Sequence, residues 1–131
     1  MIGVDTNVLV RLIINDDQQQ HSLAKKFFAG LSADFPGFVS LTTVIETVWT
    51  LRRSYAMDAE TVGRFINKLL SSREIIVQAP AVVRRGMRDA LEAKADFADA
   101  VISHLGIDAD CDYTVTFDRS AANLPGMLLL K

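Results

Sequence analysis

The chain opens with MIGVDTNVLVRLII (residues 1–14), where an apolar run is interrupted by a carboxylate, a hydroxyl and an amide at Asp5, Thr6 and Asn7. The residues before Asp5 have the composition of a short buried strand, and the apolar residues after Asn7 have helical spacing. A strand that passes through an acidic residue directly into a helix is typical of chains that alternate strands with helices. The stretch therefore predicts an α/β fold with Asp5 at the carboxyl end of the first strand.

The same alternation continues along the chain. Further strands are predicted at 36–41, 73–78, 113–117 and 126–130, and further helices at 15–31, 42–55, 57–72, 80–94 and 96–106, with a short helix or turn at 118–125. These strands are apolar throughout rather than alternating, which is typical of a parallel sheet covered on both faces. We therefore expect about five parallel strands in one sheet between helices.

Several residues predict where individual helices begin and end. Asp16 and Asp17 are polar caps before the second helix, and Asp58 is an N-cap. Pro80 occupies the favoured first turn of its helix, and Gly106 is expected to end the helix that starts near residue 96.

Length and composition narrow the class of protein. The chain has 131 residues, of which 50% are hydrophobic and 23% charged, so we expect a single domain over 1–131 with a well-filled core. No signal peptide and no apolar run near ~20 residues is visible, so we expect a cytoplasmic protein that does not span a membrane. Because Cys111 is the only cysteine, an internal disulfide and a thiolate zinc site are excluded.

Five acidic residues fall after predicted strands or at the beginning of predicted helices. The carboxyl ends of parallel strands meet at one edge of a sheet, so we expect these side chains to converge there. Two carboxylates ~4 Å apart repel by about 4 kcal/mol at an effective dielectric constant of ~20, so such a cluster favours a bound cation. Oxygen ligands without histidine or cysteine favour Mg²⁺ or Mn²⁺. The five residues are Asp5, Glu46, Asp96, Asp99 and Asp118.

Each carboxylate also has an ordinary structural explanation. Asp5 has the character of an Asx-turn residue, and Asp118 could cap a short helix. Thr43 and Glu46 fit the S/T-x-x-E capping box. Asp96 could be an N-cap, with Asp99 placed to favour the helix dipole. Capping alone does not explain why all of these residues fall at one edge.

The charge balance bears on the partner. The chain has 14 basic and 16 acidic residues, a net charge of −2, which argues weakly against a nucleic-acid partner. If the five carboxylates bind metal, basic residues outnumber the remaining acidic ones, and this argument reverses. Arg11 and Arg119 follow Asp5 and Asp118 closely, so they are the first candidates for contacts with substrate phosphates.

Four ordered segments together resemble a known family. They are VDTNVLVR (4–11), TTVIETVWTL (42–51), DFADAVISHLG (96–106) and TFDRSAANLPGMLLL (116–130). In combination they resemble the PIN-domain ribonucleases, most closely the VapC-type toxins of bacterial toxin–antitoxin pairs, and the similarity extends over the whole chain. The resemblance implies a five-stranded parallel sheet between helices and metal-dependent cleavage of single-stranded RNA, leaving a 5′-phosphate and a 3′-hydroxyl.

The resemblance also implies residue roles and partners. The family's acidic positions fall on Asp5, Glu46, Asp99 and Asp118, with Asp96 as an additional carboxylate; Thr6, Asn7 and Thr116 accompany them. It implies a Mg²⁺ or Mn²⁺ ion, an RNA substrate, a cognate antitoxin and a homodimer. The predicted helices at 42–55 and 58–70 carry apolar residues on more than one face, so we expect part of them to form a groove for an antitoxin segment.

Two other functions stay open at this point. A phosphatase of the haloacid dehalogenase type is suggested by VDTNVL, although Asn7 replaces its second aspartate and the chain is short for the usual cap. A non-catalytic RNA-binding module on the same fold is the other, although bare carboxylates do not help to bind phosphates.

Overall fold

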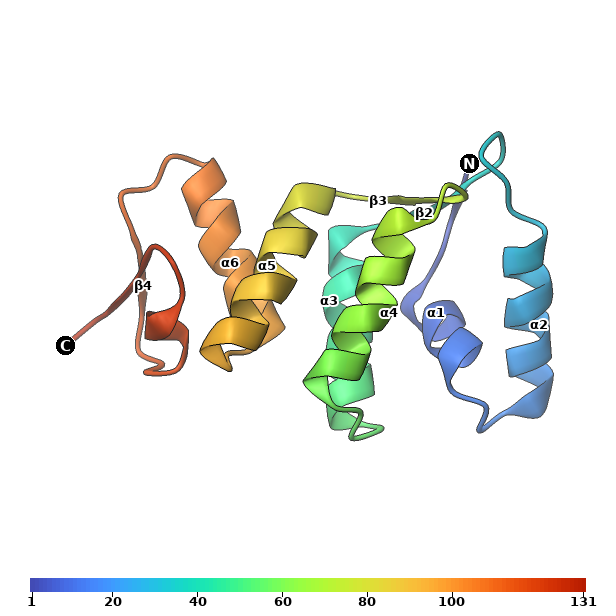
Figure 1. Cartoon of the computed structure of the whole chain (residues 1–131), viewed down its shortest axis with the longest axis horizontal. Coiled ribbons are helices and arrows are strands. Elements are labelled where there is room, and N and C mark those ends of the chain that lie inside the picture. Colours follow the sequence, from blue (N-terminus) through green and yellow to red (C-terminus); the bar gives the residue numbers. More distant parts are fainter. The chain divides into compact units, whose positions relative to one another are not determined.

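The computed structural model describes residues 1–131, which form six α-helices, five short strands and one 3₁₀ helix (Figure 1). The chain divides into two compact units, Met1–Gln78 and Ala79–Lys131, and each is described by itself below. None of the helices combines the length and the apolar composition that a membrane span requires.

The first unit is a parallel three-stranded sheet with helices in its connections. The strands are β1 (Ile2–Gly3), β2 (Gly37–Val39) and β3 (Ile75–Val77), and the helices are α1 (Thr6–Ile13), α2 (Gln18–Ala29), α3 (Leu41–Arg53) and α4 (Ala59–Ser71). The strand order is β1-β2-β3, with Ile2 opposite Gly37 and Gly37 opposite Ile75. Two helices lie in each connection between neighbouring strands, and side chains from β2, α1, α3 and α4 form the core, including Leu9, Val39, Leu51 and Ile66.

Side-chain caps set the beginnings of all four of these helices, and aspartates cap α2 and α4. The Asp17 carboxylate accepts a hydrogen bond from the amide of Gln20 at 3.0 Å, and the Asp58 carboxylate accepts one from Thr61 at 2.7 Å. Asp17 and Asp58 are therefore confirmed as N-caps, whereas Asp16 is not a cap. Asp58 has a pKa below its usual value, mainly because of the hydrogen bonds from Thr61.

Helix α3 begins earlier than the expected Thr42 or Thr43. Ser40 is its N-cap, and the Ser40 hydroxyl accepts a hydrogen bond from the amide of Thr43 at 3.1 Å. Thr43 is buried inside the first turn, so the proposed capping box of Thr43 with Glu46 is wrong. Glu46 lies in the interior of the helix, where it caps nothing.

The second unit pairs two helices with a two-stranded parallel sheet. Its elements are α5 (Pro80–Ala93), α6 (Phe97–Asp108), β4 (Thr114–Thr116), the 3₁₀ helix η1 (Ala121–Asn123) and β5 (Met127–Leu129). Thr114 lies opposite Met127 in the parallel pair. Pro80 is confirmed in the first turn of α5, and α5 packs along α6 through buried residues that include Val83, Met87, Ala100 and Val101.

A buried polar pair also joins α5 to α6. His104 Nε2 lies 2.5 Å from a carboxylate oxygen of Asp89, and Arg88 Nε donates to the other oxygen at 3.0 Å. His104 and Asp89 are only 6% and 7% exposed. Burial by itself raises the pKa of Asp89, but the hydrogen bonds from Arg88 and His104 outweigh burial, and the pKa lies below its usual value.

Gly106 does not end α6, as the sequence predicted. The helix continues to Asp108, and a Cβ atom at position 106 would come within 2.5 Å of the Thr114 hydroxyl oxygen. The glycine is therefore explained by the close approach of β4 to the helix, rather than by a helix terminus.

The α/β class with parallel strands is confirmed, but the strands do not form one five-stranded sheet. They are only two or three residues long and pair as a group of three and a group of two. Apolar composition indicates that a strand is buried without specifying which neighbour supplies its hydrogen bonds, so strand number was predictable and strand pairing was not. A single domain over 1–131 stays a prediction.

Candidate functional site

Asp5 lies at the junction of β1 and α1, as the opening stretch predicts. Its carboxylate accepts a hydrogen bond from the amide of Thr6 at 2.7 Å, and its carbonyl oxygen accepts from Val8 at 3.2 Å. Asp5 is therefore the N-cap of α1, and its side chain remains exposed. A carboxylate at a helix N-terminus also interacts favourably with the helix dipole.

Glu46 is brought next to Asp5 from the middle of α3. The Thr6 hydroxyl donates a hydrogen bond to a Glu46 carboxylate oxygen at 3.3 Å, although the two residues are forty positions apart in the chain. Asp5, Glu46 and Thr6 line one cavity of about 320 Å³. Glu46 is exposed and caps no helix, so its contacts are the hydrogen bond from Thr6 and the cavity that it faces.

A positively charged side chain lies at the same cavity. Arg11 forms an ion pair with Asp16, donates to Gln20 at 2.7 Å through Nε, and donates to the Tyr55 hydroxyl at 3.3 Å. Tyr55 in turn donates to Asp16 at 2.9 Å. Hydrogen bonding by Tyr55, together with the charge of Arg11, holds the pKa of Asp16 below its usual value, so Asp16 remains a carboxylate that fixes the guanidinium.

Tyr55 and Gln20 are residues that the sequence did not indicate. Tyr55 follows the end of α3 and lines the cavity with Arg11 and Asn7. Its contact with α1 spans 44 positions of sequence, and no local spacing predicts such a contact.

The second unit holds the other three carboxylates. Asp96 is the N-cap of α6 and accepts a hydrogen bond from the amide of Ala98 at 2.8 Å. Asp99 lies in the first turn of the same helix. Burial raises the pKa of Asp99, and the negative charges of Asp96 and Asp118 raise it further. The Asp99 carboxylate is therefore close enough to those of Asp96 and Asp118 to be repelled by both.

Asp118 is held by the turn that follows β4. Its carboxylate accepts hydrogen bonds from the amides of Ser120 at 2.8 Å and Ala121 at 3.3 Å, and its own amide donates to the Thr116 hydroxyl at 3.0 Å. The T-x-D pattern thus has a direct structural meaning, since Thr116 fixes the backbone that carries Asp118. Arg119, next in the chain, is exposed.

The structure brings the predicted residues together in two groups. Asp5 and Glu46 share a cavity in the first unit with Thr6, Asn7 and Arg11. Asp96, Asp99 and Asp118 interact through their charges in the second unit. No three histidine, cysteine, aspartate or glutamate side chains come together as a group that could hold a metal ion. The convergence of all five carboxylates therefore stays a prediction.

The capping explanations hold for some of these residues and fail for others. Asp5, Asp96 and Asp118 each accept a hydrogen bond from a backbone amide, so each has a local structural role. Glu46 has no such role, and the environment of Asp99 disfavours its ionised form.

Comparison with known families identifies the class of protein. The PIN domain family matches residues 2–120, and the chain belongs to this family. PIN domains are typically metal-dependent nucleases that bind RNA, so membership indicates a nuclease-like function. No curated protein gives a significant match to the chain.

The donor chemistry of the candidate ligands suits the divalent metal that the family implies, although no three of them lie together as a metal site. Every candidate ligand is a carboxylate oxygen, which is the donor type that Mg²⁺ and Mn²⁺ prefer. Asp5 and Glu46 line an open cavity. Burial raises the pKa of Asp99, and the neighbouring negative charges of Asp96 and Asp118 raise it further. A cation would relieve that repulsion.

Proposed function

We propose that this protein is a Mg²⁺- or Mn²⁺-dependent endoribonuclease that cleaves single-stranded RNA. The observation that carries the proposal is the shared cavity of Asp5, Glu46 and Arg11. It combines two anionic oxygen donors for a cation with a fixed guanidinium for a phosphate. Family membership supports the same reaction class.

The carboxylates are proposed to act as one metal-binding set. Asp5, Asp99 and Asp118 would hold the ion, and Glu46 and Asp96 would contact it directly or through water. A bound divalent ion supplies two effects, a lowered pKa of coordinated water and neutralisation of charge on the phosphate.

The remaining polar residues would orient these carboxylates and the substrate. Thr6 orients Glu46 through its hydrogen bond, and Thr116 orients Asp118 through the backbone. Arg11 is held by Asp16, Gln20 and Tyr55, so it can meet a phosphate without first losing side-chain freedom. Asn7 lines the same cavity, and Arg119 follows Asp118 as a further phosphate contact.

Cleavage of a labelled single-stranded RNA tests this proposal. We expect cleavage with Mg²⁺ or Mn²⁺, none with EDTA, and products that carry a 5′-phosphate and a 3′-hydroxyl. Cleavage that continues in EDTA, or products with a 2′,3′-cyclic phosphate, would contradict it.

The same assay separates the alternatives. A non-catalytic RNA-binding module is favoured by the capping roles of Asp5, Asp96 and Asp118, and it would bind the RNA and leave it intact. A haloacid dehalogenase-type phosphatase would release phosphate from small phosphomonoesters, and the family match gives this alternative no support.

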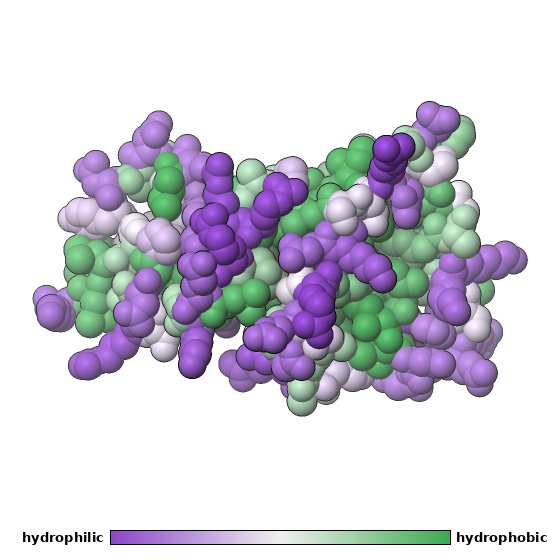
Figure 2. Space-filling view, viewed as in Figure 1, coloured by the Kyte–Doolittle hydropathy of each residue, from purple (hydrophilic) through white to green (hydrophobic).

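We also propose a toxin role in the cytoplasm, with an antitoxin partner and a homodimer. The resemblance of the four sequence segments to VapC-type toxins supports this role. Helix α3 adds support, since it buries Val44, Val48 and Leu51 while Trp49 is 55% exposed, so the helix presents an apolar side chain to a partner. Figure 2 shows hydrophobic residues among hydrophilic ones on the face in view.

Co-purification and light scattering test the partner proposal. The product of the neighbouring gene should form a stable complex that stops RNA cleavage, and Trp49→Ser should weaken that complex. A strict monomer that does not respond to the neighbouring gene product would rule out this role.

A further inference from the structure

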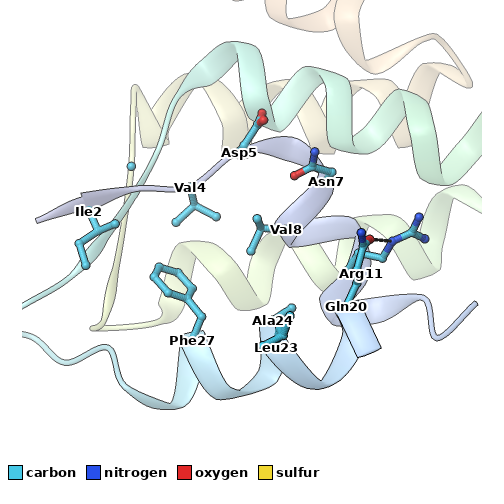
Figure 3. Close-up of a pocket in the computed structure, with 11 residues that line it drawn as sticks. Ile2, Val4, Asp5, Asn7, Val8, Arg11, Gln20, Leu23, Ala24 and Phe27 are labelled. Carbon is cyan, nitrogen blue, oxygen red and sulfur yellow. Dashed lines mark hydrogen bonds between the residues drawn. The ribbon is translucent and has the colours of Figure 1, made fainter. Parts of the chain in front are cut away.

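A second, larger cavity lies between α1 and α2 beside β1, within the first unit (Figure 3). Its volume is about 500 Å³, which falls in the range of small-molecule sites. Val4, Val8 and Phe27 point into it, and the apolar wall is continued by Leu23, which is 59% exposed although it is a large hydrophobic residue. The apolar wall of this cavity takes no part in the proposed metal chemistry.

The two cavities of the first unit adjoin along α1. Asp5, Asn7 and Arg11 line both of them. Figure 3 shows the Asp5 carboxylate directed away from Val4, Val8 and Phe27, so the acidic side chain and the apolar wall lie on different sides of the start of α1. A ligand with an anionic group at Arg11 could therefore place an apolar, planar group between the helices.

Polar groups gather at one end of the apolar cavity. Gln20 Oε1 accepts the hydrogen bond from Arg11 Nε at 2.7 Å, which leaves the two amide hydrogens of Gln20 free to donate. Asn7 is exposed and offers both a donor and an acceptor. His21 Nδ1 lies 2.7 Å from the carbonyl oxygen of Arg11, which fixes the start of α2 against the end of α1. The polar end is thus rigid and carries unused hydrogen-bonding groups.

This combination matches a nucleobase. A base in single-stranded RNA presents a π-face that stacks on aromatic or apolar side chains and an edge that takes specific hydrogen bonds. A purely apolar peptide side chain would make no use of the amides of Asn7 and Gln20. The adjoining guanidinium suits the phosphate that every nucleotide carries.

We infer that the cavity between α1 and α2 binds one base of the RNA substrate, in the nucleotide next to the phosphate that lies at Asp5 and Glu46. This inference rests on the proposed ribonuclease function, since it assigns a base subsite to the same substrate. Phe27 and Leu23 provide the apolar contacts, and Asn7 and Gln20 select the base.

Nucleotide titration of the whole protein, without metal, tests the inference. The probes are AMP, GMP, CMP and UMP, with ribose 5-phosphate as the probe that lacks a base. In protein labelled on the methyl groups of valine and leucine, at least one nucleotide should shift the Val4, Val8 and Leu23 signals, and ribose 5-phosphate should not. No shift with any nucleotide, or equal shifts with ribose 5-phosphate, would overturn the inference.

Two neighbouring phenylalanines provide a matched pair of variants. Phe27 lines the cavity, whereas Phe28 packs edge-on against Phe27 at 5.4 Å without lining it. Base stacking is worth ~1 kcal/mol or more, so Phe27→Leu should weaken nucleotide binding at least ~5-fold and Phe28→Leu by less than ~2-fold. Equal effects of the two variants would overturn the stacking contact.

An exposed residue keeps the test independent of folding. Gln20 is exposed, and Gln20→Ala should leave the fold intact while changing the order of affinity among the four nucleotides. An unchanged order would overturn the role of Gln20 in base selection. Because none of these measurements needs cleavage, nucleotide binding by a protein that cuts no RNA would refute the nuclease proposal alone. Cleavage without nucleotide binding would refute the base subsite alone.

Discussion

The carboxylates of this protein fall into two kinds when each is viewed in its own surroundings. Asp5, Asp96 and Asp118 accept hydrogen bonds from backbone amides, which gives each of them a local structural role. Glu46 and Asp99 lack that support. Glu46 depends on the Thr6 hydroxyl, and Asp99 is partly buried beside two like charges. The raised pKa of Asp99 means that its charge costs stability, and such groups are enriched at functional sites.

Neutralising Asp99 should therefore not harm the metal-free fold. Because the pKa of Asp99 is raised, its ionised form costs stability above that pKa, and the cost disappears as pH falls through it. In EDTA at pH 7, Asp99→Asn should melt at the same temperature as wild type or higher, with a gain of up to about 1 kcal/mol. The difference should shrink on acidification.

The matched control for Asp99 is Asp112→Asn, at an exposed loop position, which should have no effect on melting. Wild type should also gain stability when Mn²⁺ is added, since an ion that binds only the folded state stabilises it by mass action. The Asp99→Asn variant should lose most of that gain. A variant that melts lower in EDTA and responds to Mn²⁺ like wild type would show that Asp99 is only a helix-dipole residue.

At the scale of single elements, the contact of α6 with β4 explains why the sequence-based prediction for Gly106 was wrong. Gly106 was expected to end the helix, because glycine commonly follows a helix C-terminus. The structure instead shows glycine inside the helix, where only a hydrogen atom leaves room for Thr114. A prediction of helix ends from sequence uses the conformational preferences of neighbouring residues. This glycine is required instead by a contact with Thr114, eight positions further along the chain.

Two helix glycines should respond in opposite ways to alanine. Gly86 in α5 has its closest neighbour 3.5 Å from an added Cβ atom, so Gly86→Ala should stabilise the protein by roughly 0.5 to 1 kcal/mol through helix propensity. Gly106→Ala should instead destabilise it by about 1 to 3 kcal/mol, because the added carbon meets Thr114. Chemical denaturation measures both changes in stability. When Thr114→Ala is added to Gly106→Ala, the lost stability should be recovered. A stabilising Gly106→Ala would contradict the contact.

The stability that the buried Asp89–His104 pair contributes should depend on pH, and the direction of that dependence can be tested. Asp89→Asn replaces a carboxylate that accepts from His104 and Arg88, and it should cost about 1 to 3 kcal/mol at pH 7. The pKa of Asp89 is lowered, so its contribution is present above the usual carboxyl pKa and is lost as pH falls through the folded-state value. The cost of the substitution should therefore diminish in acid. A cost that does not change with pH would mean that the charge of Asp89 is not involved.

At the scale of the whole molecule, the order of strands and helices could be predicted from the sequence, while the pairing of the strands could not. Alternating apolar segments and residues such as Asp58 and Pro80 carry local signals, and the structure confirms them. The sequences of the short strands did not indicate which strands pair with one another. The five strands form a three-stranded and a two-stranded sheet.

The candidate site could likewise be predicted only in part from the sequence. Asp5 at the end of β1 and the Thr116–Asp118 turn follow from local sequence, whereas the contacts of Glu46 with Thr6 and of Arg11 with Tyr55 join segments about forty residues apart. The apolar cavity between α1 and α2 is also a product of packing that no motif announces.

The central claim is that the Asp5 carboxylate acts in metal-dependent RNA cleavage and is more than a helix cap. Asparagine caps helices about as well as aspartate, so Asp5→Asn keeps the hydrogen bond from Thr6 while it removes the charge. Asp17→Asn makes the same change at the cap of α2, and the Asp17 side chain lines neither cavity. The two variants therefore differ in the site and match in the local chemistry.

The decisive measurement is the rate of RNA cleavage in Mg²⁺ by wild type, Asp5→Asn and Asp17→Asn, with all three shown to be folded. The account predicts a loss of at least ~100-fold for Asp5→Asn, because a metal ligand and its charge are removed, and a change of less than ~2-fold for Asp17→Asn. Cleavage by Asp5→Asn at the wild-type rate would contradict it.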